Sequence, residues 1–186
     1  MSGLLSPRQT YKPFLYEKAF EYWQKQQNAH WLATEVSMAG DIQDWKSNLT
    51  ESERAVVAGV LKGFIQTELV VNDYWTKKVS SWFRHPEIAM MCSGFGSQET
   101  IHVHGYAYLN DSLGIEDYDA FLSEPTAKAK IDRIVDIVDD LKSARGTKGK
   151  HDIALSLAVF SAFTEGVSIF SAFAVLLNFS RFNKLK

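Results

Sequence analysis

Isolated acidic residues in apolar stretches are the part of this sequence that could carry out chemistry. Glu68 lies in the stretch FIQTELVV, and Glu99 precedes His102 by three residues. Glu165 is the single charged residue between positions 153 and 179. A carboxylate is costly to bury unless it is protonated, paired or bound to a metal ion. These three acids are therefore candidate metal ligands.

The spacing of Glu99 and His102 favours shared ligation of one metal ion. Three residues turn an α-helix through about 300°, so both side chains project from nearly the same face. The Glu-x-x-His pattern alone is common by chance. Its combination with isolated acids on two other segments is typical of di-iron and di-manganese carboxylate bundles. Carboxylate and imidazole ligands suit both metals.

Tyr106 follows His102 by four residues. On a helix this spacing places both side chains on one face. A tyrosine beside a metal pair can be oxidised to a radical when oxygen is activated there. Without a metal site, the same tyrosine is an ordinary core residue.

The elements that must position these residues are predicted to be helices. Proline is scarce and long stretches lack a strong helix breaker, which predicts an all-α fold. Thr50 and Glu53 form a capping box, Pro86 suits a first helical turn, and Gly114 suits a helix end. Helices are expected over residues 14–27, 51–79, 86–113, from 125 onward and 153–179, with connections at 30–44 and 145–150.

Length and composition narrow the class of protein. A chain of 186 residues predicts one domain, 1–186, with a flexible N-terminus over about residues 1–12. Cys92 is the single cysteine, which argues against a disulfide framework and favours the cytoplasm. A net charge of −2 argues against nucleic acid as the main partner. The polar N-terminus does not resemble a secretory signal.

The apolar run over residues 153–179 has a second interpretation as a membrane helix. About 20 apolar residues are long enough to cross a bilayer. Glu165 lies in the middle of this run, where a bilayer would disfavour it, and aromatic belts are absent. We therefore expect a core helix that presents Glu165 to a metal, and no membrane association.

Four ordered segments resemble the small, radical-generating subunit of class I ribonucleotide reductase. They are WLATEVSM followed by DIQDW (31–45), QTELVVND (66–73), SQETIHVHGY (97–106) and FTEG (163–166). The resemblance extends over nearly the whole chain from Tyr11. It implies a ferritin-like di-metal carboxylate bundle and an oxidoreductase that uses oxygen to generate the radical for ribonucleotide reduction.

The resemblance also implies a ligand set. Glu68 takes the place of the ligand from the first helix, Glu99 and His102 that of the second-helix pair, and Glu165 that of a third-helix ligand. The cofactor would be two metal ions, iron and/or manganese. The first ligand is more often aspartate in this family, and the glutamate form occurs in branches that include manganese/iron enzymes. The metal identity therefore stays open.

Further residues correspond to the family's radical machinery. Tyr106 takes the place of the radical tyrosine, although the best-known manganese/iron enzymes replace it. Trp31 takes the place of the tryptophan that starts the electron path towards the large subunit. Ile169 and Phe173 would shield the radical from solvent, or equally would be plain core residues.

Four ligands are fewer than the six of the complete family site. Family members continue into a helix with a second Glu-x-x-His pair and a tail that docks on the large subunit. We therefore expect an N-terminal part that lacks the last metal-binding helix and is inactive without a complementary chain and the large subunit. A truncated or processed form explains the sequence equally well. The family usually forms small-subunit dimers.

Two alternatives remain open on the sequence alone. Another ferritin-like di-metal oxidase would use the same ligands but would not need Tyr106 or Trp31. A non-catalytic helical scaffold would need none of these residues. Metal analysis separates the scaffold from both enzymes, and a tyrosyl radical signal separates the reductase from the oxidase.

Overall fold

The computed structural model describes residues 3–139 and 146–185, and within these ranges the chain is helical with no strand. This confirms the predicted all-α class for the described residues. The elements are α1 (Glu17–Asn28), η1 (Ala33–Glu35), α2 (Ala39–Ser47), α3 (Glu51–Asp73), η2 (Tyr74–Val79), α4 (Ser80–Trp82), α5 (Pro86–Leu113), α6 (Tyr118–Ser123), α7 (Pro125–Asp139), α8 (Gly146–Val159), η3 (Phe160–Ile169), α9 (Phe170–Asn178) and η4 (Phe179–Phe182).

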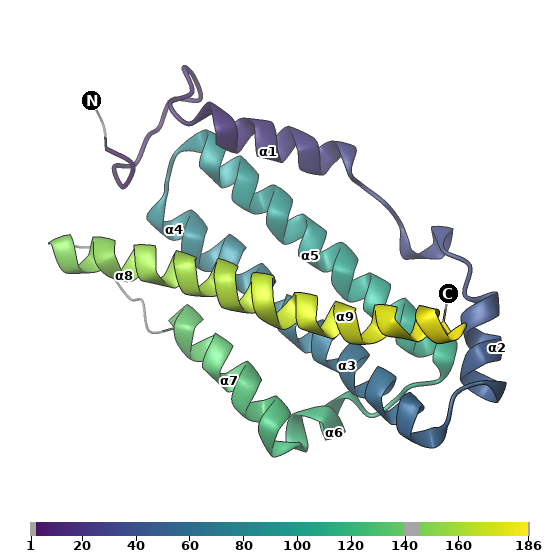
Figure 1. Ribbon diagram of the computed structural model, residues 1–186. Helices are drawn as coiled ribbons and strands as arrows, with labels where there is room; N and C mark the ends of the chain where they lie inside the picture. Colours follow the sequence, from purple (N-terminus) through teal and green to yellow (C-terminus); the bar gives the residue numbers. More distant parts are fainter. Residues whose placement is uncertain (1–2, 140–145, 186) are drawn as a thin grey trace.

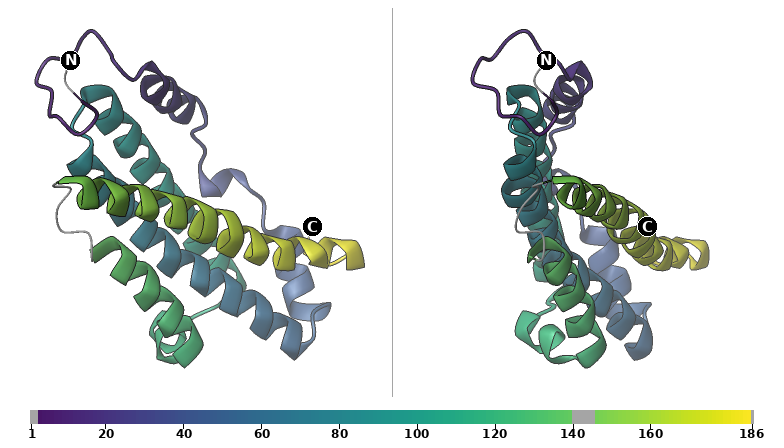
Figure 2. Two further views of the ribbon diagram at one scale, coloured as in Figure 1. Left: turned by 60° about the vertical axis from the view of Figure 1, so that its left-hand side comes forward. Right: turned by 90° about the vertical axis from the view of Figure 1, so that its left-hand side faces the viewer.

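Three long helical rods carry the candidate ligands. The long helices α3 and α5 pack side by side, with α1 against α5 and α7 against α3 (Figure 1). The segments α8, η3 and α9 form one continuous rod that crosses the α3–α5 pair on one face (Figure 2). We call this rod the terminal helix. Its arrangement brings Glu165 over the two helices that carry Glu68, Glu99 and His102.

The predicted helix boundaries follow from local chemistry. The Thr50 hydroxyl accepts from the Glu53 backbone N–H at 3.3 Å, and the Glu53 carboxylate accepts from the Thr50 N–H at 2.8 Å. Pro86 occupies the first position of α5. Gly114 ends that helix in the left-handed conformation, with φ of 69°. These boundaries confirm the predicted starts of α3 and α5 and the predicted end of α5.

Replacing Thr50 with alanine should remove the capping box and lower the free energy of unfolding by about 1 kcal/mol. The reason is that the first-turn N–H groups of α3 lose their side-chain acceptor. Thermal unfolding followed by circular dichroism would measure the loss. Ser52→Ala in the same exposed turn is the matched control, and equal effects of the two substitutions would contradict the capping role.

Four predicted boundaries were wrong. The first helix, expected from residue 14, begins at Glu17. Residues 39–47 form α2 instead of a connection, because Ile42 and Trp45 pack onto a hydrophobic cluster supplied by α3 and the terminal helix. Positions 146–150 belong to α8 instead of a loop, and Gly149 is buried; position 145 lies outside the described residues. The predicted α-helix over 51–79 turns into the π-helical segment η2 after Asp73.

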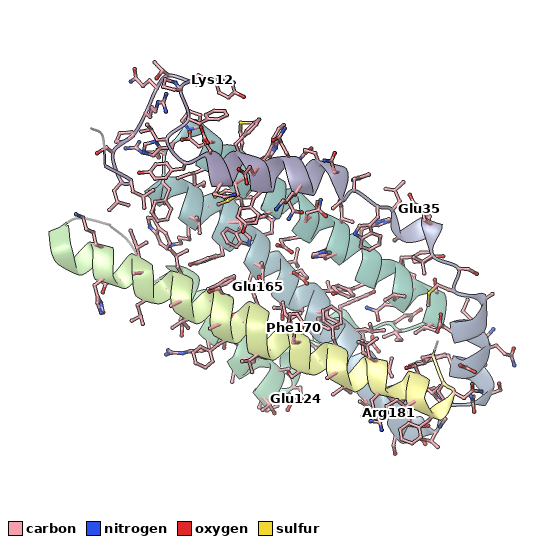
Figure 3. The ribbon with its side chains drawn as sticks, turned by 45° about the horizontal axis from the view of Figure 1, so that its top comes forward. Lys12, Glu35, Glu124, Glu165, Phe170 and Arg181 are labelled. Carbon is pink, nitrogen blue, oxygen red and sulfur yellow. The ribbon has the colours of Figure 1, made fainter. Side chains whose placement is uncertain are left out.

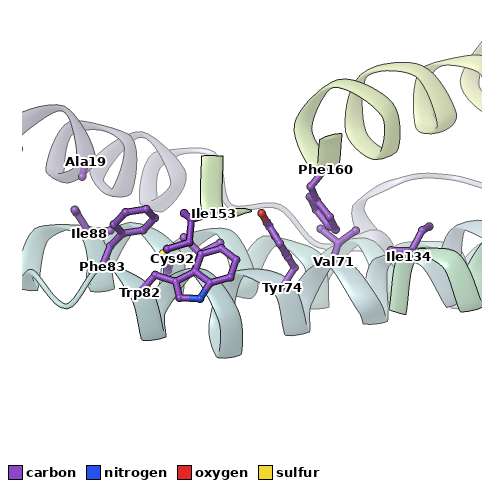
Figure 4. Packing of buried hydrophobic residues seen from close by; sticks show 11 residues of the cluster. Ala19, Val71, Tyr74, Trp82, Phe83, Ile88, Cys92, Ile134, Ile153 and Phe160 are labelled. Carbon is purple, nitrogen blue, oxygen red and sulfur yellow. The ribbon is translucent and has the colours of Figure 1, made fainter. Parts of the chain in front are cut away.

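The hydrophobic core has two clusters on either side of the acidic residues. One cluster centres on Tyr74, whose ring stacks on Phe160 of the terminal helix with centroids 3.7 Å apart (Figure 4). The Tyr74 hydroxyl lies 3.1 Å from the Ser156 hydroxyl, so its polar end is satisfied inside the core. The other cluster includes Phe64, Leu113 and Ile169. These clusters hold the terminal helix on α3.

The outward face of the terminal helix is apolar and uncovered in the described structure. Its most exposed apolar side chains are Phe163, Val167, Phe170 and Leu177, which we call the apolar strip. Phe170, labelled on this helix in Figure 3, is the most exposed of the four. Two helical stretches, Glu51–Trp82 and Gly149–Phe182, are long and apolar enough to cross a membrane by length and composition, and core helices of soluble proteins share this property.

Candidate metal centre

Three of the four predicted metal ligands converge in the structure. Glu68 on α3 and Glu99 and His102 on α5 each place one ligand atom so that all three atoms lie within 4.8 Å of one another. The Nδ1 atom of His102 lies 2.9 Å from a Glu99 carboxylate oxygen and 3.9 Å from a Glu68 oxygen. The α3–α5 packing thus joins side chains that are more than 30 residues apart in sequence.

The two carboxylates of this cluster are buried, and they outnumber the one histidine that can carry positive charge. The side chains of Glu68 and Glu99 are 4% and 11% exposed, whereas the side chain of His102 is 37% exposed. Burial raises the pKa of Glu99. The carboxylates of Glu68 and Glu99 raise the pKa of His102 to about 10. A proton on His102 therefore supplies positive charge where a metal ion would otherwise supply it.

Glu165 faces the same space from the terminal helix (Figure 3). It lies outside the group of three but lines a cavity of about 770 Å³ together with Glu68, Glu99 and His102. Its Oε1 atom is buried and has no hydrogen-bond partner among the described residues. Burial, followed by repulsion from Glu99 and Glu68, raises its pKa to about 7. A cation in this cavity would remove that repulsion.

The helix around Glu165 has an unusual geometry. Phe160–Ile169 forms the π-helical segment η3 inside the terminal helix. Such interruptions occur frequently at functional sites, because the widened turn changes the direction of the side chains it carries. The residues present fit a divalent metal ion: oxygen and nitrogen donors converge, negative charge is in excess, and one carboxylate oxygen is unpartnered.

Tyr106 lies beside the acids in an aromatic stack. The centroid of its ring lies 4.6 Å from that of the Phe64 ring, on which it stacks. The centroids of the Phe64 and Phe173 rings are 4.8 Å apart. Ile169 belongs to the same hydrophobic cluster. Burial and the neighbouring carboxylates Glu68, Glu99 and Glu165 raise the pKa of Tyr106. The phenol therefore keeps its proton over the physiological pH range.

Trp31 reaches the same cavity from the segment that precedes η1. This residue is far from α5 in sequence, yet its ring lies against the helix at Gly105. All eight predicted site residues thus line the cavity: Trp31, Glu68, Glu99, His102, Tyr106, Glu165, Ile169 and Phe173.

Comparison with known proteins identifies the family of this chain. Residues 8–186 match the family described as ribonucleotide reductase, small chain. The chain belongs to the ribonucleotide reductase small-chain family. A small-chain relative from Invertebrate iridescent virus 6, named a probable ribonucleoside-diphosphate reductase small subunit, is 35% identical over 185 residues, which covers 95% of this chain and 51% of the relative. The subunit beta of Chlamydia pneumoniae is 29% identical over 181 residues, covering 93% of this chain and 52% of that protein.

The fold of this small-chain family member is also that of solved relatives. The ribonucleotide reductase R2 subunit from Clostridium botulinum superimposes with a TM-score of 0.78 at 17% identity, over 95% of this chain and 56% of that one. This likeness confirms the predicted ferritin-like helical bundle. The chain spans about half the length of the curated relatives it matches.

Two residues that contact cavity-lining side chains in this small chain were missed by the sequence analysis. Phe64 stacks on Tyr106 and packs against Phe173, and its position four residues before Glu68 was the available signal for a shared face. Gly105 contacts Trp31, and a glycine inside a long helix was the signal for a close approach. Both contacts join segments distant in sequence.

The metal-free small chain should lose stability as pH rises from about 5 through 7. The pKa of Glu165 is raised from 4.5 to about 7, so the folded state retains a proton that the unfolded state has released. The raised pKa values of Glu99 and His102 act in the same direction. Glu165→Gln should flatten this dependence, as measured by urea unfolding across the range. Glu116→Gln at an exposed acid is the control, and an unchanged slope in Glu165→Gln would contradict the assignment.

Proposed function

We propose that this chain forms the ligand-bearing part of a ribonucleoside-diphosphate reductase small subunit, an oxidoreductase component that generates the radical for ribonucleotide reduction. The observation that supports this most is the convergence of Glu68, Glu99 and His102 beneath the unpartnered carboxylate of Glu165. Membership of the small-chain family supports the same assignment.

In this proposal the four side chains supply part of the ligand set for two metal ions, iron and/or manganese, and a second Glu-x-x-His pair completes it. The bound ions would supply redox chemistry with oxygen. Glu68, Glu99 and Glu165 contribute negative charge from three helices, and His102 must release its proton to become a ligand. Metal affinity should therefore fall as the pH is lowered.

Tyr106 is proposed as the radical residue because its protonated phenol lies against the acids in a shielded setting. Oxidation of a neutral phenol to a radical removes one electron and one proton, and the adjacent carboxylates are candidate proton acceptors. Ile169 and Phe173 would limit water access, since both pack in the Tyr106 cluster. Trp31 is proposed to carry electrons between this cavity and the exterior.

The open cavity and the apolar strip support a further helix as partner. Exposed apolar side chains on this scale are typical of surfaces that another element covers. We propose that the covering helix supplies the second Glu-x-x-His pair and belongs to the half of the relatives beyond the matched region, as a continuation or as a separate complementary chain. The assembled protein would act in the cytoplasm as a small-subunit dimer with the large subunit, without nucleic acid or membrane.

Metal stoichiometry tests this proposal. The chain would be titrated anaerobically with Mn(II), alone and with the remaining half of the iridescent virus 6 relative expressed separately. We expect incomplete loading alone and two ions per chain in the mixture. Full loading of the chain alone would refute the need for a complementary helix, and no binding under either condition would favour a helical scaffold.

After oxygen exposure, the spectroscopic signal separates two enzyme classes. A tyrosyl radical in electron paramagnetic resonance supports the reductase small subunit. Metal oxidation without a radical would favour another ferritin-like oxidase.

A further inference from the structure

The contact between Trp31 and Gly105 is closer than any side chain at position 105 would allow. A Cβ atom built on Gly105 would lie 2.9 Å from one carbon of the Trp31 ring and 3.7 and 3.8 Å from two others. Ordinary contacts between carbon atoms begin at about 3.5 Å. An alanine here would therefore force the ring away from α5 by roughly 0.6 Å or more.

The chain around Trp31 limits the ways in which this clash could be relieved. Ala33 is 2% exposed, so the segment is packed two residues after the ring. The Tyr108 hydroxyl on α5 donates to the Val36 carbonyl at 3.3 Å and holds the other end of η1. The backbone of this segment is thus attached to α5, and the Trp31 side chain is the part that must move.

Gly105 also occupies a special place along α5. It lies three residues after His102 and directly before Tyr106. Trp31, His102 and Tyr106 line the same cavity, so a displacement of the Trp31 ring changes its distance from both. By contrast, a Cβ atom at Gly59, inside α3, would meet no atom within 4 Å. A Cβ atom at Gly96 on α5 would also clash, with Thr76, but neither of those residues lines the cavity. The contact at Gly105 is distinguished by joining two residues that both line the cavity.

We propose that Gly105 is a positioning residue, whose missing side chain allows Trp31 to lie against α5 at a set distance from His102 and Tyr106. The geometric part of this inference depends only on the contact. Its consequence, that Gly105 sets the distance for electron transfer through Trp31, rests on the proposed function.

A double-mutant cycle in thermal stability tests the geometric part. Gly105→Ala should lower the melting temperature in the native background, because the clash outweighs the higher helix propensity of alanine. The same substitution should raise it in a Trp31→Phe background, where the smaller ring leaves room. Gly59→Ala is the matched control and should raise the melting temperature in both backgrounds. An effect of Gly105→Ala that is the same in both backgrounds would overturn the inference.

Fluorine NMR tests the positioning directly. The chain would be labelled with 5-fluorotryptophan, and the Trp31 resonance assigned by its loss in Trp31→Phe. Mn(II) bound at Glu68, Glu99 and His102 should broaden this resonance strongly in the native chain. Gly105→Ala should shift the resonance and reduce its broadening while leaving Mn(II) affinity unchanged, whereas Gly59→Ala should do neither.

The outcomes separate the two proposals. Unchanged position and broadening of Trp31 in Gly105→Ala would overturn the positioning role even if the metal site is real. Absence of any Mn(II)-dependent broadening in the native chain would count against the metal site, and the stability cycle would still decide the contact between Gly105 and Trp31.

Discussion

Replacing His102 with alanine should lower the affinity for Mn(II) or Fe(II) on the order of 100-fold or more, since loss even of a residue that only orients a ligand costs roughly 10- to 100-fold. Within residues 3–139 and 146–185, His102 is the single imidazole that lines the cavity, and its Nδ1 atom lies within 4 Å of both Glu68 and Glu99. Without it the two carboxylates repel each other across a buried space. Anaerobic calorimetric titration of the metal-free protein would measure the affinity.

His104 provides a control two residues away on the same helix. Its side chain is exposed and does not line the cavity, so His104→Ala should leave the affinity unchanged. The dependence on pH is a second check. Metal binding to the native chain should release a proton from His102 and weaken as the pH falls. Equal affinity of the His102→Ala and native proteins would exclude this histidine as a ligand.

Replacing Tyr106 with phenylalanine should abolish the tyrosyl radical signal after reconstitution with metal and oxygen, and should leave metal affinity within about twofold of the native value, because the ring packing is retained. Phenylalanine keeps the stack on Phe64 and removes only the hydroxyl that can lose a proton. Electron paramagnetic resonance would record the signal in the metal-loaded protein with its complementary helix.

Tyr108→Phe tests whether the signal belongs to position 106. Tyr108 lines the same cavity and donates to Val36. Its replacement should leave the tyrosyl radical signal present. A radical that persists in Tyr106→Phe but disappears in Tyr108→Phe would move the assignment to the other tyrosine.

The helices were predictable where the signal is local. A capping box begins α3, a first-turn proline begins α5 and a left-handed glycine ends α5. Each of these signals lies within a few residues of the boundary that it sets. Helix α2 was missed because its stability depends on Ile42 and Trp45 packing against distant elements. The π-helical segments were missed for a similar reason: a change of helical register leaves no strong mark in amino-acid type.

The candidate ligands were predictable because charge in an apolar run is unusual and the Glu-x-x-His spacing is local. The sequence could not show how far each acid reaches. In the structure Glu68, Glu99 and His102 converge, whereas Glu165 faces them across the cavity and stands outside their close group. That difference depends on where the terminal helix crosses α3.

The sequence by itself determined the helical class, the residue types of a candidate metal site and the family resemblance that the comparisons confirmed. These properties reside in residue identity and in spacings of three or four positions. Only the tertiary structure decided that Trp31 lies on Gly105, that Phe64 contacts both Tyr106 and Phe173, and that no described residue covers the apolar strip. These contacts join residues far apart in the chain, so they depend on how whole helices pack.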